Sequence, residues 1–159
     1  MANLKYTDFK ITFAEIPDEI SLCINISNCP CLCKNCHSSY LAEDIGIILT
    51  TSELKKIIDI SKGISCVAFM GGDSNPAIIS GLAYYIKDNY PNLKVAWYSG
   101  RQELSKDINL QDFDIIKLGP YIEELGPLNS TTTNQRYYEV KRNKLGEYYL
   151  EDKTYKFWK

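Results

Sequence analysis

The chain has 159 residues, of which 45% are hydrophobic and 24% are charged, a composition typical of one globular domain over residues 1–159. Its formal net charge of −2 supplies no basic surface, and its apolar runs are too short for a bilayer span, so we expect neither nucleic acid nor membrane as a partner. The first residues lack a charged leader followed by an apolar stretch, so a cytoplasmic location is the default expectation.

The expected secondary structure alternates between strands and helices along the chain. Apolar runs, alternating or continuous, predict strands at residues 11–13, 20–26, 64–70, 94–99 and 113–118. The capping pattern Thr50-Thr-Ser-Glu53 predicts the start of a helix that Gly63 ends. Pro76 predicts the first turn of a second helix over 76–89, and a short helix is expected at 102–106.

Strands that alternate with helices are typical of βαβ units, so the expected fold class is α/β with a mostly parallel sheet. Near the C-terminus, residues 136–141 and 147–150 alternate around a turn, which predicts a β-hairpin. Ligand sites in parallel sheets lie at the carboxyl ends of the strands. We therefore expect the cysteine-rich loop, Gly71-Gly72-Asp73, Ser99-Gly100 and Gly119-Pro120 to meet at one edge of the sheet.

The cysteines are unusually clustered. Four of the six, Cys29, Cys31, Cys33 and Cys36, fall within eight positions, which indicates a metal or redox centre rather than a disulfide scaffold. The spacing Cys29-x-x-x-Cys33-x-x-Cys36 supplies three thiolates, and thiolates suit iron–sulfur clusters or zinc. Three thiolates on a 4Fe–4S cluster leave one iron open to a further ligand.

Other metal sites are compatible with the same residues. A zinc site would use the four clustered cysteines or recruit His37, although the chain has no second Cys-x-x-Cys pair. A ferredoxin-type cluster would need Cys31, or the more distant Cys23 or Cys66, as its fourth ligand. Cys23 and Cys66 lie within expected strands, where a cysteine usually packs as a small apolar residue.

Gly71-Gly72-Asp73 follows the strand expected at 64–70. Together with the cysteine spacing, it resembles the radical S-adenosylmethionine superfamily, whose corresponding motif is Gly-Gly-Glu. The resemblance implies an incomplete βα barrel, a 4Fe–4S cluster on Cys29, Cys33 and Cys36, and S-adenosylmethionine with its amino group at the glycine motif. One electron from the reduced cluster would cleave the sulfonium to methionine and a 5′-deoxyadenosyl radical.

Three further segments resemble the family of activating proteins of anaerobic ribonucleoside-triphosphate reductase. They are Ala96-Trp-Tyr-Ser-Gly100, Gly119-Pro-Tyr-Ile-Glu-Glu-Leu125 and Thr133-Asn-Gln-Arg136. The resemblance implies hydrogen abstraction from a glycine of that reductase, and an electron donor such as flavodoxin or ferredoxin. Ser99 is a candidate to bond the methionine carboxylate or the ribose, and Lys117 is a candidate polar contact with the cofactor. Asn134, Gln135 and Arg136 are candidates to contact cofactor or partner.

The chain departs from the superfamily pattern at Asp73, which is shorter than Glu, and at Asn35, where many members have an aromatic residue. Two rival functions stay open. One is another radical enzyme, either an activator of a different glycyl-radical enzyme or a small-molecule enzyme like the deazaguanine-ring synthases. The other is a non-enzymatic zinc or electron-transfer module, which would bind metal and leave S-adenosylmethionine intact.

Overall fold

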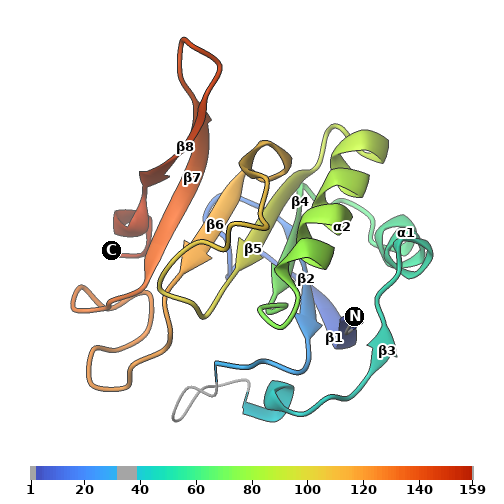
Figure 1. Ribbon diagram of the computed structural model, residues 1–159, viewed down its shortest axis with the longest axis horizontal. Coiled ribbons are helices and arrows are strands. Elements are labelled where there is room, and N and C mark those ends of the chain that lie inside the picture. Colours follow the sequence, from blue (N-terminus) through green and yellow to red (C-terminus); the bar gives the residue numbers. More distant parts are fainter. Residues whose placement is uncertain (1–2, 32–38, 159) are drawn as a thin grey trace.

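The computed structural model describes residues 3–31 and 39–158 of the chain. An eight-stranded sheet with the order β3-β1-β2-β4-β5-β6-β7-β8 forms its centre (Figure 1). The strands are β1 (Lys5–Thr12), β2 (Ser21–Ile26), β3 (Ile47–Ile48), β4 (Cys66–Met70), β5 (Lys94–Tyr98), β6 (Ile115–Leu118), β7 (Arg136–Arg142) and β8 (Tyr148–Asp152). The helices are α1 (Thr51–Ile60) and α2 (Pro76–Asn89), with short 3-10 turns η1 (Ser39–Ala42), η2 (Leu110–Asp112) and η3 (Thr154–Phe157).

The four central strands, β2, β4, β5 and β6, run parallel to one another, so their carboxyl ends lie at one edge, as predicted. The other four pairs in the described part of the chain are antiparallel, which makes the sheet mixed rather than mostly parallel. The physical reason is connection length. A parallel neighbour needs a long crossover, whereas the β7–β8 hairpin turns within a few residues.

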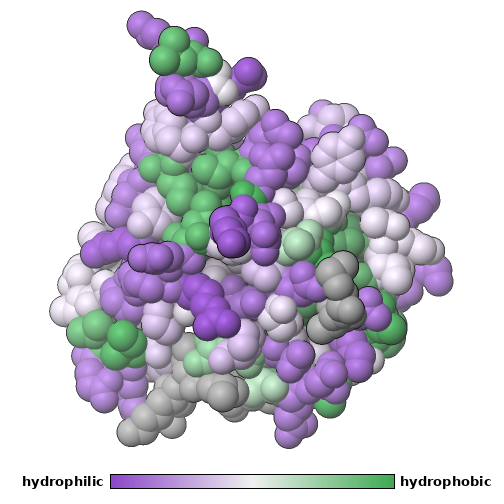
Figure 2. Space-filling model, in the orientation of Figure 1, coloured by the Kyte–Doolittle hydropathy of each residue, from purple (hydrophilic) through white to green (hydrophobic). Residues whose placement is uncertain are grey.

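The two faces of the sheet have different coverings. Side chains alternate along each strand, so Leu22, Phe69 and Trp97 point to the face that α1 and α2 cover, where they form the larger core. The helices leave part of this face open, and Figure 2 shows hydrophobic atoms at the surface over β6 and β7. The opposite face is here called the loop face, because residues of loops and of η3, including Ile16 and Phe157, pack on it.

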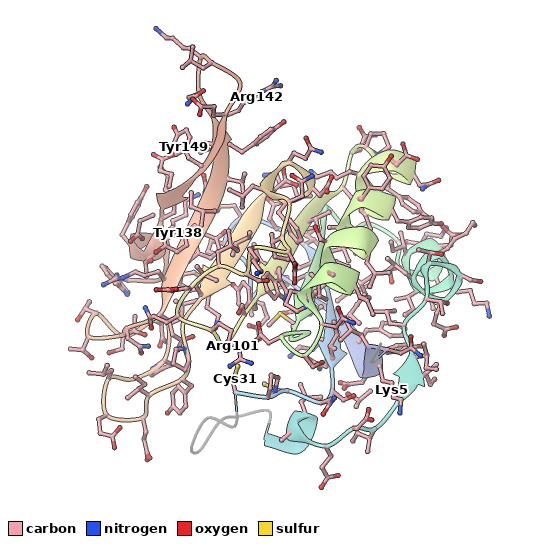
Figure 3. All side chains as sticks on the ribbon, viewed as in Figure 1. Lys5, Cys31, Arg101, Tyr138, Arg142 and Tyr149 are labelled. Carbon is pink, nitrogen blue, oxygen red and sulfur yellow. The ribbon has the colours of Figure 1, made fainter. Side chains whose placement is uncertain are left out.

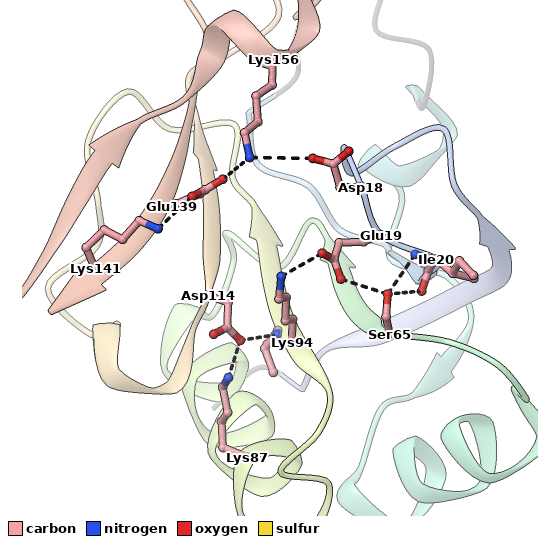
Figure 4. A network of polar contacts seen from close by, with 11 residues as sticks. Asp18, Glu19, Ile20, Ser65, Lys87, Lys94, Asp114, Glu139, Lys141 and Lys156 are labelled. Carbon is pink, nitrogen blue, oxygen red and sulfur yellow. Dashed lines mark hydrogen bonds and ion pairs between the residues drawn. The ribbon is translucent and has the colours of Figure 1, made fainter.

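A network of hydrogen bonds and ion pairs connects neighbouring segments at the amino ends of the parallel strands (Figure 4). Lys94, the first residue of β5, donates to Glu19 at 2.9 Å, and the Ser65 hydroxyl donates to the same carboxylate at 2.9 Å. The Asp114 carboxylate, just before β6, accepts from the Lys87 ammonium and from the backbone N–H of Val95. Charged groups at this edge are therefore engaged with one another.

Most expected elements are present with shifted ends. Helix 76–89 is found with the predicted bounds, and the Thr50 side chain accepts from the Glu53 N–H at 3.1 Å, which confirms the capping pattern. The strand expected at 11–13 is instead the longer β1, and Phe13 lies beyond it, 83% exposed. The predicted helix at 102–106 is wrong. The Ser105 hydroxyl accepts from the Asp107 N–H at 3.2 Å, and such local side-chain bonds compete with helix formation.

No helix among the described residues is both long and apolar enough to cross a bilayer.

The cap of α1 yields a stability prediction. Thr50→Ala removes the side-chain oxygen that accepts from the Glu53 N–H, and it should lower the free energy of unfolding by about 1 kcal/mol in denaturant titrations. Thr51→Ala is the matched control, because Thr51 is exposed and lies inside the helix, so its change should stay within about 0.5 kcal/mol. Equal effects of the two substitutions would contradict the cap.

Candidate metal and ligand site

The carboxyl ends of the central strands border a pocket of about 790 Å³ that extends over the loop face. Its lining comes from each predicted segment: Cys29 and Cys31 after β2, Asp73 after β4, Gly100 after β5, and Gly119 after β6. Residues far apart in the sequence thus share one cavity because the strands that precede them are parallel neighbours.

The cysteine segment leaves β2 through a sharp change of direction. Asn28 adopts a left-handed conformation with φ of 59°, which asparagine tolerates better than most residues. The N–H groups of Asn28 and Cys29 donate to the carbonyl groups of Glu43 and Leu41 at 2.9 and 2.8 Å, so the returning chain holds this entry. Figure 3 shows Cys31 at the edge of the sheet where the strands end. Cys33, Cys36, His37 and Asn35 lie outside the described residues.

Gly71 and Gly72 are required by close packing. Both have positive φ, 119° and 103°. A Cβ on Gly71 would lie 2.8 Å from the carbonyl oxygen of Ile26, and a Cβ on Gly72 would lie 2.6 Å from the Ile79 side chain. The indole N–H of Trp97 donates to the Gly71 carbonyl at 2.7 Å. The two glycines therefore let the loop after β4 turn tightly against β2 and α2.

Asp73 is held in place by hydrogen bonds to both of its carboxylate oxygens. Its side chain is buried, Oδ1 accepts from the Ser99 hydroxyl at 2.6 Å, and Oδ2 accepts from the Gly100 N–H at 2.8 Å. Ser99 is itself buried, and its oxygen accepts from the Arg101 N–H at 3.0 Å. Ser99 therefore orients the Asp73 carboxylate, and the Asp73 carboxylate joins the loops that follow β4 and β5.

Lys117 brings a buried positive charge to the same pocket. Its ammonium donates to the Gly119 carbonyl at 3.1 Å and lies 5.7 Å from the centre of the Tyr98 ring. Burial raises the pKa of Tyr98, so this ring stays a neutral phenol, and its hydroxyl donates to the Glu15 carbonyl at 2.8 Å. The pocket thus contains a buried carboxylate and a buried ammonium, the pair of charges that a zwitterionic ligand requires.

The two segments after β6 that resemble the reductase activators contact each other. The Asn134 amide donates to the Pro120 carbonyl at 3.1 Å, and a Cβ on Gly119 would lie 3.0 Å from the Cα of Gln135. Gln135 is buried and borders the pocket, whereas Arg136 begins β7 and stacks 6.0 Å from the Trp158 ring. Of the three candidate contacts at 134–136, Gln135 alone is on the pocket lining.

The cysteines within the sheet differ from those in the loop. Cys23 and Cys66 are buried, and burial raises the pKa of Cys23 to about 11 and that of Cys66 to about 12, which disfavours the thiolate that binds metal. Cys66 also begins β4, so four residues of strand, about 13 Å, separate it from the carboxyl edge. Both therefore pack as small apolar residues, as the sequence predicts.

Some lining residues were not anticipated from the sequence. Asp8 and Lys10 on β1, with Asn25 on β2, line the pocket, and the Asn25 amide donates to the Asp8 carboxylate at 3.0 Å. Asp8 and Lys10 are two residues apart, so the period-two rule would have put them on one face once the bounds of β1 were known. The contact of Cys31 with Asp73 had no sequence signal, because 42 positions separate the two residues.

Comparison with known families bears on this arrangement. A family described as a 4Fe-4S single cluster domain matches residues 20–140, which is more than half of the chain. The chain belongs to the 4Fe-4S single cluster domain family. It is therefore an iron–sulfur protein, and the matched range contains the cysteine loop and every pocket segment from β2 to β7. Searches of the curated proteins and of the solved structures find no match.

The described residues fit the cluster of this family. Cys29 supplies a soft sulfur donor on the lining of the pocket, and Gly100, which has no side chain, leaves space beside the neighbouring Cys31. Within residues 3–31 and 39–158, no three potential metal ligands form a group. The predicted set extends to Cys33 and Cys36 in the remaining segment, so the three-cysteine ligation stays a prediction.

The glycine geometry gives a second stability prediction. Gly71→Ala should lower the free energy of unfolding by about 3 kcal/mol, because it adds both left-handed backbone strain and a contact with the Ile26 carbonyl. Gly81→Ala is the matched control in the middle of α2, where a Cβ meets nothing within 4 Å; it should stabilise the chain by about 1 kcal/mol. Denaturant titration measures the free energy of unfolding of both variants. A change in the same direction in both would contradict the requirement for glycine at the tight turn.

Proposed function

We propose that the chain is a radical S-adenosylmethionine enzyme that carries its 4Fe–4S cluster on Cys29, Cys33 and Cys36. The observation that supports this proposal best is the meeting of Cys29, Asp73 and Lys117 on one pocket of about 790 Å³. That volume falls within the range of about 300–1,000 Å³ that is usual for small-molecule sites. In this proposal the loop face is the inner wall of an incomplete βα barrel.

The charges of the pocket match the methionine part of S-adenosylmethionine. The Asp73 carboxylate, oriented by Ser99 and the Gly100 N–H, accepts hydrogen bonds from the ligand ammonium. The Lys117 ammonium, oriented by the Gly119 carbonyl, pairs with the ligand carboxylate. Because both protein groups are already buried and held, little rearrangement is needed when the ligand binds. Tyr98 and Met70 line the same cavity and help to keep water from the reacting atoms.

When bound, a reduced 4Fe–4S cluster supplies the single electron that cleaves the sulfonium to methionine and a 5′-deoxyadenosyl radical. That electron originates from an external donor such as flavodoxin or ferredoxin. The protein's own contribution is to bind and orient the ligand and to exclude water. Hydrogen abstraction from a glycine C–H then gives 5′-deoxyadenosine and a glycyl radical, so one electron and one hydrogen atom account for the products.

The proposed substrate is a glycine of anaerobic ribonucleoside-triphosphate reductase. The segments that resemble activators of that enzyme, Gly119 to Leu125 and Thr133 to Arg136, meet beside the pocket through the bond between Asn134 and Pro120. Both segments follow β6, and Gly119, Tyr121 and Gln135 reach the lining. A partner protein that inserts a chain segment at this rim would also cover the pocket and shield the radical.

Anaerobic reconstitution with iron and sulfide tests the cluster and the cleavage. After reduction with dithionite, we expect a 4Fe–4S electron paramagnetic resonance signal that changes on addition of S-adenosylmethionine, with 5′-deoxyadenosine as a product. Cys29→Ala should lose at least about 80% of the signal, because the cluster loses a thiolate. Cys66→Ala is the matched control, since that cysteine lies in the sheet, and it should retain the signal. A signal indifferent to S-adenosylmethionine would favour an electron-transfer module, and zinc without a cluster would favour a zinc module.

The partner is tested by mixing the reduced chain and S-adenosylmethionine with purified anaerobic ribonucleoside-triphosphate reductase. We expect a glycyl-radical doublet in the reductase and one 5′-deoxyadenosine per radical. A different glycyl-radical enzyme should give no doublet. Cleavage of S-adenosylmethionine with a doublet only in that second enzyme would assign the chain to another activator class.

A further inference from the structure

Cys31 is the one clustered cysteine that the three-ligand spacing leaves without a role. We propose that Cys31 is a positioning residue whose thiol holds the Asp73 carboxylate, and that it is not an iron ligand. The first part, that Cys31 holds Asp73, rests on the proposed function, because the carboxylate is held for the ligand ammonium. The second part, that Cys31 does not bind iron, does not depend on the proposed function.

The first observation is the contact between the two side chains. The Cys31 sulfur lies 3.5 Å from Asp73 Oδ2, a distance suited to a thiol that donates to an oxygen. The same carboxylate accepts from the Ser99 hydroxyl and the Gly100 N–H. Three donors from two segments therefore converge on one buried carboxylate: Ser99 and Gly100 belong to the segment after β5, and Cys31 is the donor contributed by the cysteine loop.

The second observation is the identity of residue 100. Gly100 is not among the glycines with positive φ, so its backbone does not demand glycine. A Cβ there would lie 2.8 Å from the Cys31 sulfur and 3.1 Å from the Cys31 Cβ. The absence of a side chain at position 100 thus provides the space in which Cys31 is seated, and the Gly100 N–H points to the same Asp73 oxygen.

The chemistry of the pair separates the two possible roles of Cys31. An iron-bound thiolate has no proton to donate, and its negative charge would lie against the Asp73 carboxylate at hydrogen-bond distance. A Cys31 thiol instead adds a donor to the buried Asp73 carboxylate, beside the Ser99 hydroxyl and the Gly100 N–H.

The experiment compares the Cys31→Ser and Cys31→Ala variants of the full chain, each after anaerobic reconstitution with iron and sulfide. Iron and sulfide per chain should equal the wild-type values in both variants. The dissociation constant for S-adenosylmethionine should rise about tenfold in Cys31→Ala and less than about twofold in Cys31→Ser, because serine retains a donor to Asp73. Loss of half the iron or more in both variants would overturn the proposal, and so would equal weakening of binding with the iron retained.

A second measurement does not depend on S-adenosylmethionine. Gly100→Ala should lower the unfolding midpoint temperature by about 5 °C in the wild-type background and by less than half of that in the Cys31→Ala background, since the sulfur is then gone. Equal shifts in the two backgrounds would overturn the seating of Cys31 against Gly100. If the wild-type chain binds no S-adenosylmethionine at all, the proposed function fails, while the iron content and this cycle still decide the role of Cys31.

Discussion

The parallel pairing of β2, β4, β5 and β6 is the constraint on which the site depends. Each pair is held in a fixed register, with Asn25 beside Met70, Met70 beside Tyr98, and Tyr98 beside Lys117. These four residues form a row on the loop face, and the chain beyond each strand begins at the same edge. Because side chains alternate along a strand, a slip of one residue between β5 and β6 would move Lys117 to the helix-covered face and out of the pocket.

The two edges of this parallel core have different chemistry. At the amino edge, lysines and carboxylates such as Lys94 and Glu19 pair with each other across neighbouring segments, which fastens the strands and leaves their charges mutually compensated. At the carboxyl edge, the Asp73 carboxylate accepts from a hydroxyl and from a backbone N–H, and the Lys117 ammonium donates to a backbone carbonyl. Both side chains line the pocket, so the edge that holds the pocket is distinct from the edge whose charges pair with one another.

Asp73 links the cysteine loop to the pocket. Its carboxylate joins the segment after β4 to the segment after β5 through Ser99 and Gly100, and Cys31 adds the segment after β2. The orientation of the Asp73 carboxylate is therefore coupled to the position of the cysteine loop. In the proposed function this coupling would keep the ligand ammonium and the cluster at a fixed separation, and small displacements of reacting groups are costly to a reaction.

The sequence alone determined what depends on local pattern: helix 76–89 with its proline, the capped start of α1, the buried strands and a cysteine spacing typical of an iron–sulfur cluster. Alternation of strands and helices also predicted one shared edge, since parallel strands end together. The local pattern wrongly predicted a helix at 102–106, where the Ser105 hydroxyl accepts from the Asp107 N–H instead. It also predicted a larger share of parallel strand pairs than the sheet contains. Only the tertiary structure decided that the Ser99 hydroxyl donates to the Asp73 carboxylate and that Cys31 packs in the space left by Gly100. Those contacts join residues dozens of positions apart, and their geometry is fixed by strand register and packing rather than by any neighbouring residue.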